Sequence, residues 1–159
     1  MDPLVVVATW VHTIAFVIAW GWFGILGRIV LPGLDGALSP GTANATLAAI
    51  ERRAVPILVL SIVLFIGTGT YLLVVDPAYR GLGNITASTW TVLMAVKHVL
   101  VVGLVIVGVV VDRLIRRLER DQPVRAARST RIRLGLLVEA ATGLGAVIAL
   151  LTVIAQAAP

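Results

Sequence analysis

The chain contains no cysteine among its 159 residues, and only 13% of its residues are charged. Without thiols, disulfides, thiolate metal sites, iron–sulfur clusters and covalently attached c-type haem are all excluded. Aromatic residues are also scarce at 6%, whereas hydrophobic residues reach 59% and the mean hydropathy is +1.03. These values lie outside the range of globular proteins and indicate an integral membrane protein.

Four apolar runs account for most of the chain, and each reaches the roughly 20 residues that a helix needs to cross a bilayer. They cover approximately residues 4–32, 54–75, 89–111 and 134–156. We therefore predict an all-α fold, in which residues 1–159 form a single antiparallel four-helix membrane bundle. A cleavable signal peptide is not expected, because no basic residue precedes the first run and that run is too long.

The connectors between the runs differ in character. Residues 32–41 are rich in proline and glycine, which predicts a turn-rich loop. Thr42 or Asn44 could then cap a short interfacial helix over residues 45–53 that leads into the second run. Residues 76–84 form a second short segment rich in turn-forming residues.

Basic residues are distributed unevenly between the two ends of the predicted bundle. Arg28 and the Arg52–Arg53 pair bracket the first connector, whereas the opposite end offers only Arg80. The third connector carries eight arginines: Arg113, Arg116, Arg117, Arg120, Arg125, Arg128, Arg131 and Arg133. The positive-inside rule places both basic connectors in the cytoplasm and both termini outside, in a bacterial-type cytoplasmic membrane. The net charge of +5 is thus attributed to topology and lipid contact rather than to nucleic acid, with a docking site as the alternative.

His12 and His98 are the only histidines, and each lies about one third of the way into an apolar run. An ionisable group in hydrocarbon needs a partner, a proton path or a metal. His12 follows Leu4 by eight residues and His98 follows Thr89 by nine, so both lie roughly 12–14 Å below the outer surface. The first and third helices are diagonal in an up-and-down bundle. Across a diagonal of roughly 11–14 Å, the two imidazoles could be the axial ligands of a haem b iron.

Small residues on the second and fourth runs are the candidates for shaping the cofactor pocket: Gly67, Gly69, Gly143 and Gly145. Glycines remove side chains that a porphyrin would strike, although close helix packing in lipid accounts for them as well. Lys97 is the only lysine, and a lysine within the membrane costs roughly 2.5–3.5 kcal/mol. A haem propionate is its expected partner, with Arg80 and Tyr71 as supports; a water-filled cavity or a carboxylate is the alternative.

A copper site is the alternative to haem. Met94 lies one helical turn before His98, and its thioether could join both imidazoles in binding copper. Glu139 is a second charge within an apolar run. It lies roughly 10 Å deeper than Lys97 and closer in level to Arg28.

Short motifs resemble two families of membrane proteins. The segment Arg131-Ile-Arg133-Leu-Gly-Leu-Leu-Val-Glu139, with Lys97 upstream, resembles the copper-resistance D (CopD) family. Trp10-Val-His12, followed by aromatic residues and glycines, resembles the first helix of that family. The chain is also similar to HemJ-type protoporphyrinogen oxidases, four-helix proteins that bind haem b. The resemblance implies functional roles for His12, Lys97 and Glu139, whereas the role of His98 rests on its depth.

We therefore predict a cytochrome b-like membrane protein that holds one haem b between His12 and His98. Two imidazole ligands saturate the iron, which favours electron transfer, with a quinone or a redox protein as partner. Copper transport of the CopD type and HemJ-like porphyrinogen oxidation are the alternatives. Whether the chain is an oxidoreductase enzyme, and whether it forms a homodimer, stays open.

Overall fold

The regular elements of the computed structural model are all helical over the residues that it describes, which are 2–77, 79, 81, 88–120 and 124–157. In chain order they are α1 (Pro3–Ile25), the π-helical η1 (Leu26–Val30), α2 (Leu31–Ala37), α3 (Pro40–Val75), α4 (Thr89–Glu119) and α5 (Val124–Ala157). Four stretches are long and apolar enough to span a membrane: Pro3–Ala37, Pro40–Val75, Thr89–Glu119 and Ala126–Gln156. The predicted all-α class is confirmed, and the chain has the four helices of a multi-pass membrane protein.

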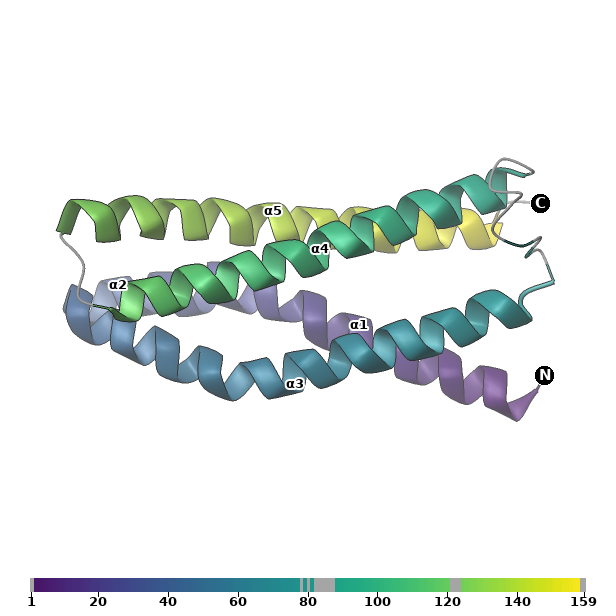
Figure 1. Ribbon diagram of the computed structural model, residues 1–159, viewed down its shortest axis with the longest axis horizontal. Coiled ribbons are helices and arrows are strands. Elements are labelled where there is room, and N and C mark those ends of the chain that lie inside the picture. Colours follow the sequence, from purple (N-terminus) through teal and green to yellow (C-terminus); the bar gives the residue numbers. More distant parts are fainter. Residues whose placement is uncertain (1, 78, 80, 82–87, 121–123, 158–159) are drawn as a thin grey trace.

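The long helices are arranged as two pairs, α1 with α3 and α4 with α5 (Figure 1). The pairs approach each other at the end that carries α2 and diverge toward the end where α1 and α4 begin. The last residues of α3 and α5 also lie at this divergent end. Both α1 and α4 pack against α3 and α5, which puts α1 and α4 at opposite corners of the bundle.

Two helices begin with side-chain caps that the sequence encodes locally. The Asp2 carboxylate accepts a hydrogen bond from the backbone N–H of Leu4 at 2.9 Å, and Pro3 occupies the first turn of α1. At the start of α4, Ser88 and Thr91 form a reciprocal capping box. These caps satisfy backbone N–H groups that have no partner inside the helix.

The first connector differs from its predicted structure. Most of the expected turn-rich loop is helical, because α2 covers Leu31–Ala37 and Pro32 lies in its first turn, where a missing N–H costs nothing. The helical path is interrupted only at residues 38–39. The expected separate interfacial helix over residues 45–53 is instead part of the 36-residue α3, which continues through Pro56. All four helical stretches therefore extend beyond the apolar runs.

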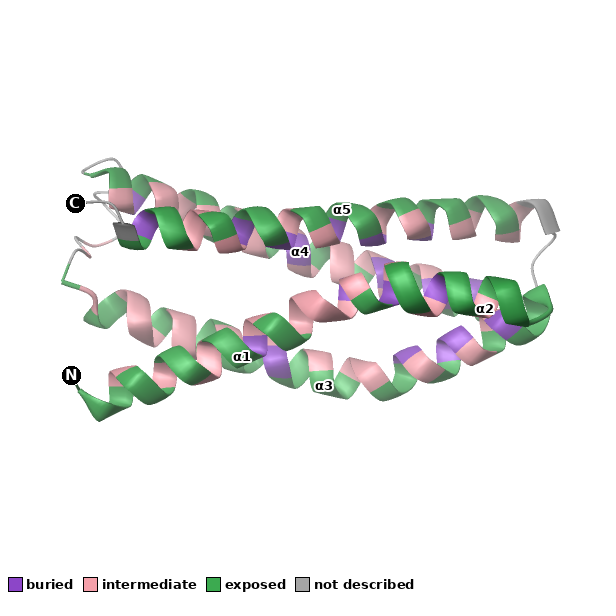
Figure 2. Cartoon of the chain, turned by 180° about the vertical axis from the view of Figure 1, so that it is seen from behind, coloured by how far each residue is buried: buried purple, intermediate pink, exposed green. Residues whose placement is uncertain are grey.

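Most of the buried apolar cluster lies in the half of the bundle that carries α2 (Figure 2). Its large, fully buried members come from η1, α3, α4 and α5: Leu26, Leu47, Val111, Ile115, Leu134, Val138 and Ile148. Helix α1 contributes Phe23. Many exposed residues are also large and apolar, as expected where a helix faces lipid. Neither His12 nor His98 belongs to this cluster.

Ion pairs join the helices at the α2 end. Arg131 of α5 pairs with Asp35 of α2 and donates a hydrogen bond to Asn44 Oδ1 of α3 at 2.7 Å. The Arg131 side chain is only 20% exposed, so these partners replace much of its hydration. Arg52 of α3 pairs with Glu119 of α4. Arginines expected to set the topology therefore also hold this end of the bundle together.

We expect Arg131→Leu to lower the free energy of unfolding by about 2–3 kcal/mol, because Asp35 and Asn44 lose a shared partner. Arg133→Leu is the matched control, since the Arg133 side chain is exposed on the same helix. Thermal unfolding in detergent measures both variants. Equal losses of stability would show that Arg131 contributes no more than an ordinary surface arginine.

Candidate functional site

The His12 imidazole is held against α3. Its Nδ1 lies 3.0 Å from the carbonyl oxygen of Phe65 and 3.2 Å from Thr68 Oγ1. The ring stacks on Phe65 with centroids 4.2 Å apart. A proton on Nδ1 satisfies the carbonyl and leaves the lone pair on Nε2, which has no hydrogen-bond partner among the described residues. This tautomer is the one in which a histidine can act as a metal ligand through Nε2.

Gly69 provides the space that His12 occupies. A Cβ atom added at this position would lie 2.8 Å from Cε1 of His12 and 3.2 Å from its Nδ1. At Gly67 an added Cβ meets nothing within 4 Å. Of the two predicted pocket glycines on α3, only Gly69 is in contact with the histidine. Tyr71 follows on the same helix, half-buried.

His98 has an exposed side chain on α4, and its Nδ1 lies 2.6 Å from the carbonyl oxygen of Met94. Its Nε2 has no hydrogen-bond partner within the described part of the chain. Lys97 is half-buried and directly precedes His98 on α4. His12, Lys97 and His98 therefore lie at similar distances from the divergent end of the bundle, on two different helices. Arg80, the predicted support for Lys97, lies outside the described residues.

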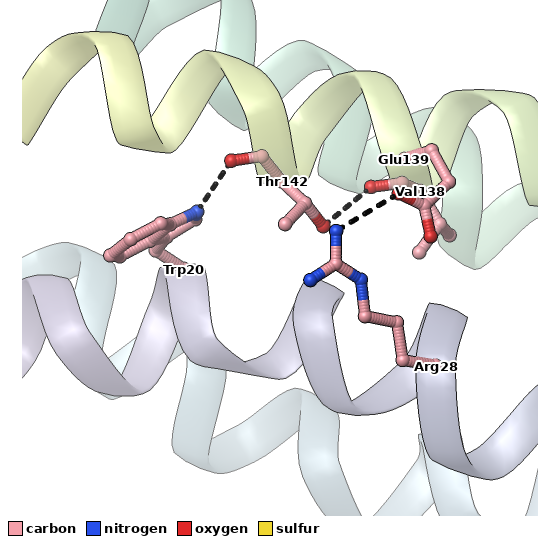
Figure 3. A network of polar contacts seen from close by, with 5 residues as sticks. All are labelled: Trp20, Arg28, Val138, Glu139 and Thr142. Atoms are coloured by element: carbon pink, nitrogen blue, oxygen red, sulfur yellow. Dashed lines mark hydrogen bonds and ion pairs between the residues drawn. The ribbon is translucent and has the colours of Figure 1, made fainter.

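The two α5 glycines lie at another level of the bundle. Gly145 faces Trp20 of α1, and a Cβ atom there would overlap the indole ring. The Trp20 Nε1 donates a hydrogen bond to the Thr142 carbonyl at 2.9 Å (Figure 3). Gly143 has nothing within 4 Å of an added Cβ. Trp20 is eight residues beyond His12, or roughly 12 Å along α1, so Gly145 accommodates Trp20 instead of bordering His12.

We expect Gly145→Ala to destabilise the protein by about 1–3 kcal/mol, because the new methyl group must displace the buried face of Trp20. Tryptophan fluorescence should shift in the same variant. Gly143→Ala is the matched control and should be neutral or slightly stabilising, because alanine favours helix and meets open space. Equal stability of the two variants would contradict the close contact between Trp20 and Gly145.

Glu139 has its own partner away from the histidines. Its Oε2 lies 3.6 Å from Nη2 of Arg28, which projects from η1 (Figure 3). Both side chains are largely exposed, at 53% and 68%. Gly27 allows α5 to approach here, because a Cβ would lie 2.8 Å from Cγ1 of Val138. The structure thus pairs Glu139 with Arg28, in keeping with its depth, and does not bring it to the histidines.

An apolar cavity of about 230 Å³ lies between α1, α3 and α4. Phe65, which stacks on His12, belongs to its wall, and Glu51 and Asp112 are its charged wall residues. Sequence reasoning missed Glu51 because it fell in the expected interfacial helix. Its spacing was the available signal, since one face of α3 carries residues at intervals of three and four: Glu51, Val55, Leu58, Ile62 and Phe65.

No group of three or more His, Cys, Asp or Glu side chains that could hold a metal ion occurs among the described residues. A scan against protein-family models finds no match, and searches of curated proteins and of solved structures find no significant similarity. The function is therefore argued from the site alone.

Proposed function

We propose that this chain is a cytochrome b-like membrane protein in which His12 and His98 bind the iron of one haem b. One observation carries the proposal: each imidazole has Nδ1 beside a backbone carbonyl and Nε2 without a hydrogen-bond partner in the described chain. Histidines that bind metals usually donate their other ring N–H in this way, because that bond fixes the tautomer and strengthens the ligand. Each ring could thus bind iron through its Nε2.

The placement of the two rings supports the same proposal. His12 follows the first residue of α1 by nine positions, and His98 follows the first residue of α4 by nine. Both helices begin at the divergent end (Figure 1), so the rings share a depth of about 14 Å. Because α1 and α4 are at opposite corners, His12 and His98 lie on diagonal helices. The exposed His98 side chain would turn inward to reach a cofactor held between them. Such a pair suits the two faces of a planar cofactor.

Lys97 supports an anionic cofactor. It makes no ion pair within the described residues, and it directly precedes His98 rather than lying at a helix end. A cation within the membrane needs a partner, and a propionate of haem would provide one. His12, His98 and Lys97 would then hold the cofactor, with Gly69 giving His12 its space and Tyr71 nearer the end of α3.

A haem with two imidazole ligands supplies one-electron transfer rather than ligand activation. We propose a quinone or a redox protein as the electron partner, in an antiparallel bundle that crosses a bacterial-type cytoplasmic membrane. The arginine-rich ends would face the cytoplasm and both termini the outside. The relationship to CopD domains and HemJ-type oxidases is also a proposal. The metal content of the purified protein distinguishes them, because copper indicates CopD-type chemistry and haem indicates HemJ-type chemistry.

The absorption spectrum of the detergent-purified protein tests the ligand pair. We expect a Soret band, and sharp α and β bands after reduction with dithionite, because two imidazoles make the haem six-coordinate. His12→Ala and His98→Ala should each lose the sharp α band, whereas Glu139→Gln should keep it. Copper without porphyrin would overturn the proposal and favour copper transport. Sharp bands that persist in His98→Ala would show that His98 is not the second ligand. A Soret band without the sharp α band in the unmodified protein would indicate a single axial ligand and favour porphyrin chemistry.

Gly69→Leu tests the geometry of the His12 site. We expect its haem content per protein to fall by about tenfold or more, because a side chain at this position displaces the His12 ring. Gly67→Leu is the matched control, since an added Cβ there meets open space. Gly67 and Gly69 flank Thr68, so the two variants differ by only two positions on the same helix. Both variants should still insert, as judged by the yield of membrane-extracted protein. Full haem occupancy in Gly69→Leu would contradict this pocket.

A further inference from the structure

The cavity between α1, α3 and α4 contains a buried acceptor without a partner. Glu51 is only 4% exposed and belongs to the cavity wall, yet its buried Oε2 has no hydrogen-bond partner among the described residues. A buried carboxylate without a donor is unfavourable, so the site favours either the neutral carboxyl or a ligand that donates to it. Glu51 therefore marks this cavity as a place where a polar group can bind.

A buried donor lies beside this acceptor. The indole Nε1 of Trp22 is buried, also without a hydrogen-bond partner in the described chain, and Trp22 belongs to the same cavity wall. Its N–H interacts with the Glu51 carboxyl group without reaching hydrogen-bonding geometry. An adjacent acceptor and donor are complementary to a hydroxyl group, which donates one hydrogen bond and accepts another.

The other charged wall residue is already satisfied. The carboxylate oxygens of Asp112 lie 3.0 and 2.9 Å from Nε of Arg116, one turn further along α4. Asp112 thus has a partner of its own, and Glu51 is the acceptor left for a ligand. A lipid acyl chain could fill the apolar part of the cavity, but it would leave both Glu51 and the Trp22 N–H unsatisfied.

The rest of the cavity wall indicates what kind of ring or chain the ligand carries. It is aliphatic and aromatic, with rings contributed by α1 and α3: Phe16, Trp22, Phe23 and Phe65. Aromatic side chains pack favourably against a planar ring in stacked or edge-to-face arrangements. A ring that carries both a hydroxyl group and an apolar tail fits the whole cavity better than an aliphatic alcohol does.

We propose that this cavity binds a lipophilic hydroquinone, whose ring hydroxyl donates to Glu51 and accepts from the Trp22 N–H. The inference specifies the quinone partner of the proposed function, and its physiological meaning rests on that function. Phe65 contributes to this wall and stacks on His12, so the ligand site adjoins the proposed haem site. Binding itself requires only the residues of the cavity.

Titration calorimetry of the purified protein in detergent, with anaerobic decylhydroquinone as the probe, tests the inference. We expect Glu51→Leu to weaken binding about tenfold or more, and Trp22→Phe about threefold to tenfold, because each removes one hydrogen-bonding group. Glu139→Leu is the matched control outside the cavity wall and should bind normally. Glu51→Leu should still fold, because an apolar side chain replaces an unsatisfied buried carboxyl group.

The dimethyl ether of the same probe is the second control, because it cannot donate a hydrogen bond. It should bind the natural chain more weakly than the hydroquinone does, and Glu51→Leu should abolish that difference. Equal binding of ether and hydroquinone, or affinities unchanged in both cavity variants, would overturn the inference and leave a lipid-filled cavity. If the protein shows the haem spectrum but does not bind the hydroquinone, this inference is wrong and the haem proposal still stands. Hydroquinone binding that depends on Glu51 in a protein without haem would support the site while ending the haem proposal.

Discussion

The bundle depends on the close packing of α1 against its two neighbours. In lipid there is little hydrophobic force between helices, so association relies on small residues that let large side chains and backbones meet. His12 fills the space at Gly69 of α3, and Trp20 fills the space at Gly145 of α5. These two contacts fix the rotation of α1 about its axis. The same rotation presents Trp22 to the cavity, so the packing of α1 also determines which of its side chains line the candidate sites.

The two ends of the molecule differ in how the helices are joined. At the α2 end, a buried apolar cluster and the ion pairs of Arg131 and Arg52 join the helices. At the divergent end the helix pairs separate (Figure 1), and the half-buried His12 and Lys97 lie eight or nine residues after the helix starts at this end. The apolar cluster and the interhelical ion pairs are thus concentrated toward one end of the bundle.

Composition and apolar runs were sufficient to predict an all-helical chain with four membrane-length helices. They could not predict where the helices end, because Pro32 begins a helical turn as readily as it ends one. The shared depth of His12 and His98 follows from counting residues along straight helices. The contact of Gly145 with Trp20 could not be predicted by such counting, because it depends on helix rotation and tilt. Glu51 was missed because a polar residue near a helix start looks solvent-exposed until a neighbouring helix covers it.

One face of α3 connects the two proposed sites. Glu51 and Phe65 are separated by fourteen residues, or roughly 21 Å along the helix, and both belong to the wall of the same cavity. Phe65 also contributes its ring and its carbonyl oxygen to His12. A ligand in the cavity would therefore be anchored by its hydroxyl near the α2 end and extend toward the residue that positions the imidazole. Because packed side chains respond together, occupancy of the cavity and the orientation of His12 are expected to be coupled through Phe65.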